Sequence, residues 1–322
     1  MTYTCCFGYQ WEVVFRYAAD IGLSIMLSLN EDSILDNEEQ HLYVREMVSR
    51  FGQYITAYSV GSLQMAQYIR ALNGHQNATT SASILWRINT STAIISLSDR
   101  VNSIDGILLL MKNASSIDIY DITKDWKVAN PHLSIFVVVS IPVTSNTSQT
   151  TLKSVSDAIW STLFSGGVGV LIEPSLSKGY DQNGNGVMAL LYNDTFVPTD
   201  PSISAIRNLW EQQIASMTST QRICNHIFVS LSNLRCLSDI KFTSLLIYVT
   251  AKSTGEVQIQ PQFFLDSSSQ YDVQWIDATT GTQVTTDITT ISNNQTGLGT
   301  PPSVSVDWMV SLRCRVGCGT GS

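Results

Sequence analysis

The sequence predicts an α/β protein in which a helix-covered parallel sheet of barrel type is followed by an antiparallel β-sandwich. Up to about residue 220, apolar segments of strand length alternate with amphipathic segments of helical length. The strand segments are continuous apolar runs such as LSIFVVVSIPV, which is typical of strands buried on both faces. Beyond residue 220 the pattern changes to period two between Ser-, Thr- and Gly-rich turns, which indicates antiparallel strands. The predicted domains are therefore residues 1–220 and 221–322.

The first predicted helix starts near residue 7, because Val14, Tyr17 and Ile21 recur at helical spacing. Gly22 is expected to end this helix in a left-handed conformation, ahead of the strand LSIMLSL. The next predicted elements, in chain order, are a helix at 38–51, a strand at 55–60, a helix at 63–73, a strand at 77–83 and a helix around 100–112.

The second half of the barrel-type domain is predicted in the same way. Pro201 suits the first turn of the last helix. Six strand–helix units result, whereas a closed (β/α) barrel needs eight. The elements are the strand SSIDIYDIT at 115–123, the strand LSIFVVVSIPV, a helix at 151–165, the strand VGVLIEP and a helix at 201–217.

Composition excludes several classes of function. At 44% hydrophobic residues, the 322-residue chain can bury a large core, while only 14% of its residues are charged, against roughly 25% in ordinary soluble domains. The net charge is −8 and no cluster of Lys and Arg is present, which disfavours nucleic-acid binding. The longest apolar runs are too short to span a bilayer.

The cysteines favour an oxidising compartment. Their spacing matches no zinc-ligand set, and an even number in a chain rich in Ser and Thr favours disulfides. Cys224 with Cys236, and Cys314 with Cys318, would be local cross-links, whereas the adjacent pair near the N-terminus needs partners elsewhere. The six cysteines are Cys5, Cys6, Cys224, Cys236, Cys314 and Cys318.

Six Asn-x-Ser/Thr acceptors agree with that compartment and predict a secreted, N-glycosylated protein. The N-terminus has no basic segment followed by an apolar one, so it is not a secretory signal, and a secreted protein is expected to have been processed or to begin further upstream. The acceptors are Asn77, Asn89, Asn113, Asn146, Asn193 and Asn294.

The order of several segments resembles the cellulase/mannanase-type superfamily of (β/α)8 glycoside hydrolases. RYAADIGLSIMLSL is similar to the third strand with its preceding helix, and VREMVSRFGQYITAYSVGS to the fourth. YIRALNGHQNATTS, PHLSIFVVVSIPV and AIWSTLFSGGVGVLIEP are similar to the regions of the fifth, seventh and eighth strands. YDVQWIDATTGTQV and SVDWMVSLR resemble the β-sandwich that follows such barrels. The resemblance spans most of residues 10–313 and implies that the first two strand–helix units are missing.

Enzymes of this superfamily use two glutamates, an acid/base and a nucleophile, about 5 Å apart in retaining members. The resemblance places Ser62 and Leu63 where the superfamily has Asn and the acid/base Glu. Ser140, or Val139 if the register shifts by one, stands at the position of the nucleophile. None of these side chains can transfer a proton or attack a sugar, so the resemblance implies a scaffold that has lost its chemistry.

Two alternatives stay open. The chain can be a helix–strand repeat that is unrelated to glycosidases, or other carboxylates can serve as catalysts. The candidates are Asp118 and Asp121 on the expected sixth strand, Glu173 at the end of the eighth, and Asp181 beyond it. Glu173 is best placed, because barrel active sites lie at the carboxyl ends of the strands.

Other motifs indicate no metal or cofactor. DQNGNG at 181–186 resembles a calcium loop, but its twelfth position is Tyr192 instead of Glu, so an ordinary turn is expected. Trp86 and Trp126 follow presumed strands, where they line a sugar cleft or, as we favour, pack in the core. The four histidines, His41, His75, His132 and His226, are not at metal-ligand spacing.

The sequence therefore predicts a non-catalytic, glycosidase-like, extracellular structural glycoprotein that needs no cofactor. Its expected partners are copies of itself or other extracellular chains that complete the barrel, because missing strands leave open sheet edges. Carbohydrate is a further possible partner. The alternatives are an active extracellular glycoside hydrolase with atypical carboxylates, and a carbohydrate-binding module.

Overall fold

The structure is a computed structural model, and it divides the chain into two compact units. The first unit comprises Met1–Ala114, Asp121–Val139 and Gly167–Ile172, and the second comprises Ser115–Tyr120, Ser140–Gly166 and Glu173–Ser322. The domain boundary at residue 220 stays a prediction. The structure describes residues 4–29, 37–75, 82–89, 94, 97, 102–111, 115–142, 149–175, 201–214, 222–224, 234–239, 243–251, 255–259, 269–291 and 297–316.

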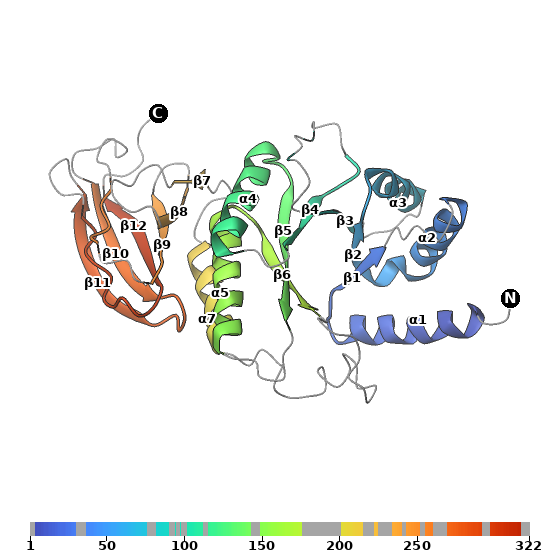
Figure 1. The fold of residues 1–322 in the computed structure, drawn as a ribbon, viewed down its shortest axis with the longest axis horizontal. Helices are drawn as coiled ribbons and strands as arrows, with labels where there is room; N and C mark the ends of the chain where they lie inside the picture. The colour runs from blue at the N-terminus through green and yellow to red at the C-terminus, as the bar shows by residue number, and fades with distance from the viewer. Residues whose placement is uncertain are drawn as a thin grey trace. The chain divides into compact units, whose positions relative to one another are not determined.

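A six-stranded sheet with sequential strand order, here called sheet A, confirms the predicted partial (β/α) barrel (Figure 1). From β1 to β5 each strand pairs in parallel with the next, and β6 lies beside β5. The strands are β1 (Ile25–Leu29), β2 (Ile55–Val60), β3 (Ser83–Asn89), β4 (Gly106–Met111), β5 (Ser134–Pro142) and β6 (Gly169–Ser175).

Helices connect the strands, as the hydrophobic spacing predicts. Helix α1 ends as expected: Gly22 has φ 79°, and the N–H of Leu23 donates to the carbonyl of Ala18 at 2.8 Å. The helices of the described chain are α1 (Thr4–Asp20), α2 (Asn37–Phe51), the 3₁₀ turn η1 (Gly52–Tyr54), α3 (Leu63–His75), α4 (Ser116–Ala129), α5 (Gln149–Phe164) and α7 (Pro201–Ile214).

Two predicted elements in the middle of sheet A are wrong. The strand expected at 77–83 instead occupies Ser83–Asn89, and residues 76–81 lie outside the described chain. The helix expected around 100–112 is replaced by strand β4 at Gly106–Met111. GILLLM is a continuous apolar run without periodicity, so its pattern alone does not distinguish a strand from a helix.

The strand expected at 115–123 is also wrong, because this segment begins helix α4. Burial in this segment recurs at helical spacing, at Ile119, Thr123 and Trp126. The IDI alternation that suggested a strand contains only the first of these residues. Among the described residues the count of six strands in sheet A is nevertheless as predicted, because β4 replaces the segment that is helical.

One face of sheet A, here called the inner face, carries a cluster made only of strand side chains. Alternate residues point to opposite faces of a sheet, and helix α3 packs beside β2 and β3 on the other side. The fully buried Tyr58, Ile84 and Ile107 alternate with the inner-face residues. The inner-face cluster consists of Ala57, Leu85, Leu108, Leu110, Phe136, Val138 and Leu171.

A separate antiparallel sheet, here called sheet B, confirms the change of pattern after residue 220. One of its faces packs with Val257, Ile259 and Leu298, and the other is covered by α5 and α7 through Trp160 and Leu209. Its strand order is β11-β10-β12-β9-β8-β7. The strands are β7 (Arg222–Ile223), β8 (Leu234–Ser238), β9 (Ser244–Val249), β10 (Ser269–Asp277), β11 (Gln283–Ile291) and β12 (Trp308–Val316).

Candidate functional site

A (β/α) barrel builds its active site at the carboxyl edge of its sheet. At this edge of sheet A, the residues directly after β2 form the start of helix α3. Ser62 accepts a hydrogen bond on Oγ from the backbone N–H of Met65 at 3.2 Å, which makes it the N-cap of α3. Leu63 is the first residue of that helix. Trp86 donates its indole N–H to the carbonyl of Gly61 at 3.1 Å and so holds the end of β2. The segment thus caps a helix and carries no acid.

The strand register shows which residues lie on the inner face of sheet A, and the described ones from β1 to β5 also include no carboxylate. Ser28 pairs with Ser59, and Ser59 pairs with Leu85, which belongs to the inner-face cluster. Arg87 lies beside Leu108, and Asn89 lies beside Leu110. Among the described inner-face residues from β1 to β5, the polar side chains are serine, arginine and asparagine, with no carboxylate.

The other predicted positions lie on the strands that the sequence suggested. Ser140 is in β5 and Glu173 is in β6, each two residues before the end of its strand. The side chains of both residues, and the whole of Asp181 with the DQNGNG segment, lie outside the described part of the structure.

Asp118 and Asp121 are not on a strand, which corrects the prediction for both. They lie in the first turns of α4, where Asp118 and Ser115 form a capping box. The backbone N–H of Ser115 donates to the Asp118 carboxylate at 3.0 Å, and the N–H of Asp118 donates to Ser115 Oγ at 3.2 Å. The hydrogen bonds from the Ser115 hydroxyl and N–H lower the pKa of Asp118. Asp121 pairs with Lys124 at 3.5 Å, so both carboxylates support the helix.

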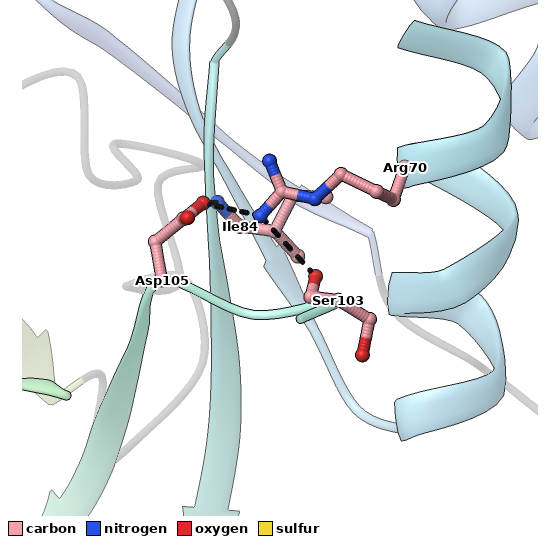
Figure 2. A network of polar contacts seen from close by, with 4 residues as sticks. All are labelled: Arg70, Ile84, Ser103 and Asp105. Atoms are coloured by element: carbon pink, nitrogen blue, oxygen red, sulfur yellow. Dashed lines mark hydrogen bonds and ion pairs between the residues drawn. The ribbon is translucent and has the colours of Figure 1, made fainter. Parts of the chain in front are cut away.

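Asp105 is a further carboxylate of sheet A, and it lies at the opposite, amino edge. Its Oδ2 accepts hydrogen bonds from Arg70 at 2.7 Å and from the N–H of Ile84 at 2.8 Å (Figure 2). Arg70 also reaches the carbonyl of Ser103 at 3.5 Å. This network joins α3 to the starts of β3 and β4, at the edge of a barrel sheet where residues serve stability and not catalysis.

Arg87 is the inner-face residue that the sequence reasoning missed. It is half-buried in β3, and its Nη1 donates to Ser28 Oγ at 3.1 Å, across the intervening strand β2. The alternation Leu85, Arg87, Asn89 is the signal that could have identified it, but only with the strand placed at 83–89.

The aromatic and histidine predictions are partly resolved. Trp126 is 1% exposed in α4, which confirms core packing, whereas Trp86 is half-buried and fixes the end of β2. Tyr58, also on β2, is fully buried, and burial raises its pKa to about 12. No cluster of three or more His, Cys, Asp or Glu side chains that could bind a metal occurs within the described ranges.

The structure contains the predicted disulfide between Cys224 and Cys236, with their Cα atoms 4.9 Å apart. Cys314 is disulfide-bonded as well.

Asn89 is exposed at the end of β3, while the other five predicted glycosylation sites fall in segments that the structure leaves undescribed. In the described chain, no helix is long and apolar enough to cross a membrane.

Comparison with solved structures identifies the architecture. A glycoside hydrolase family 5 protein from Bacteroides vulgatus matches with a TM-score of 0.68 at 12% identity, covering 94% of this chain and 73% of that one. A second protein, described as a glycoside hydrolase, matches with a TM-score of 0.66 at 10% identity, covering 94% and 76% of the two chains. No family profile and no curated protein matches the sequence. The likeness shows a fold of glycoside hydrolase type: a partial (β/α) barrel followed by an antiparallel sheet.

Proposed function

We propose that this protein is a non-catalytic relative of glycoside hydrolases that acts as a secreted, glycosylated component of an extracellular assembly. One observation carries the proposal: Ser62 and Leu63 cap and begin α3 at the point where a glycosidase of this fold would place its acid/base. Two carboxylates flanking the scissile bond are the usual requirement for glycoside hydrolysis. The disulfide between Cys224 and Cys236 supports an oxidising compartment.

The purified protein is expected to release no reducing sugar from β-glucan, mannan or chitin, and Glu173→Gln is expected to behave identically. The physical reason is that neither Leu63 nor Ser140 can protonate a leaving oxygen or act as the nucleophile. Glu173 is the carboxylate on which the competing hypothesis of an active hydrolase depends. Turnover by the wild type that falls about 10²–10⁴-fold in Glu173→Gln would establish that alternative and exclude ours.

Helix α1 supports a role in assembly, because it is apolar on two sides. Phe15 is buried and contacts Phe51 with ring centroids 5.1 Å apart. The opposite side exposes Val14 and Tyr17 by 52% and 65%, and Ile21, directly after the helix, is 54% exposed. An exposed apolar patch of this kind is typical of an interaction surface. Within the described sheet, β1 is an edge strand beside β2, and an edge strand is a template for pairing with another chain.

We propose that a strand from another extracellular chain, or from a second copy of this one, pairs with the outer edge of β1 and is covered by the exposed side of α1. The protein is then expected to elute as an oligomer or complex by light-scattering chromatography. Tyr17→Glu/Ile21→Glu should weaken the association on the order of 100-fold, since two apolar contacts are lost.

The matched control for this experiment is Val128→Glu. Val128 is 71% exposed on α4, so the substitution adds a charge to an exposed apolar position on another helix. It should leave association unchanged. A monomeric wild type, or equal weakening by the control, would contradict the proposed surface.

A further inference from the structure

Arg87 is a half-buried cation that the described protein leaves without a charged partner. Its one hydrogen bond goes to the neutral hydroxyl of Ser28, although a guanidinium carries five N–H donors. Five other arginines of the described chain lie within 4 Å of a carboxylate oxygen. These ion pairs are Arg16–Glu12, Arg50–Glu46, Arg70–Asp105, Arg207–Glu211 and Arg315–Asp272.

The surroundings of Arg87 make this arrangement costly without a ligand. On its own sheet face it lies beside Leu108, which in turn lies beside Phe136. Both belong to the apolar inner-face cluster. Burying a charge against apolar side chains is unfavourable unless the charge is paired. The bond to Ser28 holds the guanidinium over the sheet and leaves its other donors available.

The residues around Arg87 also define the size and chemistry of a ligand. Phe136 lies two strands away, roughly 10 Å at ordinary strand spacing. Gly169 lies next to the Phe136 ring, which is 3.6 Å from where a Cβ at this glycine would stand, so no side chain competes for the space there.

We propose that the inner face binds an acidic saccharide, with Arg87 forming a bidentate pair with a carboxylate or sulfate group of the sugar. The forked guanidinium matches either planar or tetrahedral oxyanions. Phe136 supplies an apolar surface for the C–H groups of the next sugar ring. Such a ligand spans the distance from Arg87 to Phe136, which a lone inorganic anion does not. The proposal concerns binding alone and holds whether or not the protein turns sugars over.

The test is calorimetric titration of the full chain with four probes: a galacturonic acid hexamer, a chondroitin sulfate hexasaccharide, cellohexaose and sodium sulfate. At least one acidic hexasaccharide is expected to bind, and the tighter of the two identifies the anionic group. Arg87→Gln should weaken that binding about 10–100-fold, because it removes a charge-assisted pair. Arg87→Lys keeps the charge but loses the fork, and it should weaken binding several-fold.

Arg45→Gln is the matched control, since Arg45 is an exposed arginine on α2 and its loss changes the net charge equally. It should bind like the wild type. Thermal unfolding of each variant shows whether it is folded, and Arg87→Lys carries the test if Arg87→Gln is not. Absence of binding to both acidic probes, equal affinity for cellohexaose or sodium sulfate, or equal weakening by Arg45→Gln would each overturn the proposal.

Discussion

Arg235→Ala is expected to lower the free energy of unfolding of the second unit by about 3 kcal/mol, because it removes hydrogen bonds that a buried charged group donates. Arg235 is 7% exposed in β8. It donates to Ser161 Oγ in α5 and, at 3.2 Å, to the carbonyl of Ser116 at the start of α4. Its guanidinium carbon lies 4.8 Å from the ring centroid of Tyr120. Truncation therefore removes two hydrogen bonds and a cation–π contact at one point.

The same arginine also acts on Tyr248, whose ring centroid is 5.8 Å from the guanidinium. Burial raises the pKa of Tyr248 most strongly, the carboxylates of Asp307 and Asp157 raise it further, and Arg235 lowers it. The arginine thus offsets negative charge beside a buried phenol. Without Arg235, the negative charges of Asp307 and Asp157 beside the buried Tyr248 phenol are expected to be less well compensated, which adds to the loss of stability.

Urea denaturation followed by tryptophan fluorescence measures this effect. Arg313→Ala is the control, because Arg313 is exposed on the neighbouring part of sheet B and bonds Gln213 at 3.3 Å; it should cost no more than about 1 kcal/mol. Arg235→Met keeps much of the volume and should fall between the two. A loss below about 1 kcal/mol in Arg235→Ala would show that the network contributes little.

The Cys224→Ala/Cys236→Ala double variant is expected to unfold with a free energy about 3 kcal/mol lower than the wild type. The disulfide closes a loop of 12 residues in sequence separation and so restricts the unfolded chain. Both cysteines are fully buried in the apolar cluster on one face of sheet B, so their loss also removes packing. The comparison is made from denaturation midpoints of the two proteins without reductant.

Each single alanine variant serves as the control for the double variant. Either substitution already removes the cross-link, so both singles should be nearly as unstable as the double, and the second change should add little. Additive losses from the two sites would indicate that packing, and not the cross-link, accounts for the effect. Equal midpoints for wild type and double variant would contradict the prediction.

Most of the fold could be predicted from local patterns, and its errors have local causes. Helix α1 and its Gly22 end, and strands β2, β5 and β6, carry strong periodicity or clear boundaries. The prediction of a helix at GILLLM is wrong because a short apolar run fits either a buried strand or a helix. The segment 115–123 fails because the Ser115–Asp118 capping box was not recognised as the start of a helix.

The candidate site at the carboxyl edge of sheet A could be predicted only where the identity of a residue after a strand was enough, without knowledge of the sheet face that it occupies. Leu63 after β2 needs no more than the strand boundary, and the structure adds the role of Ser62 as a helix cap. Arg87 could not be found, since its significance depends on which sheet face it occupies. A strand placed at 77–83 leaves it outside the sheet, whereas the register with Leu108 puts it on the inner face.

The strictly sequential order of sheet A bears on how the chain reaches its native state. Every strand adds beside the one made just before it, so the sheet can lengthen from β1 towards β6 as the polypeptide emerges from the ribosome. Its pairings are nevertheless non-local, as between Ile25 and Ile55, and parallel pairing of this kind is intrinsically slow. Sheet B differs, because β12 must insert between β9 and β10, and its completion must therefore await the synthesis of β12.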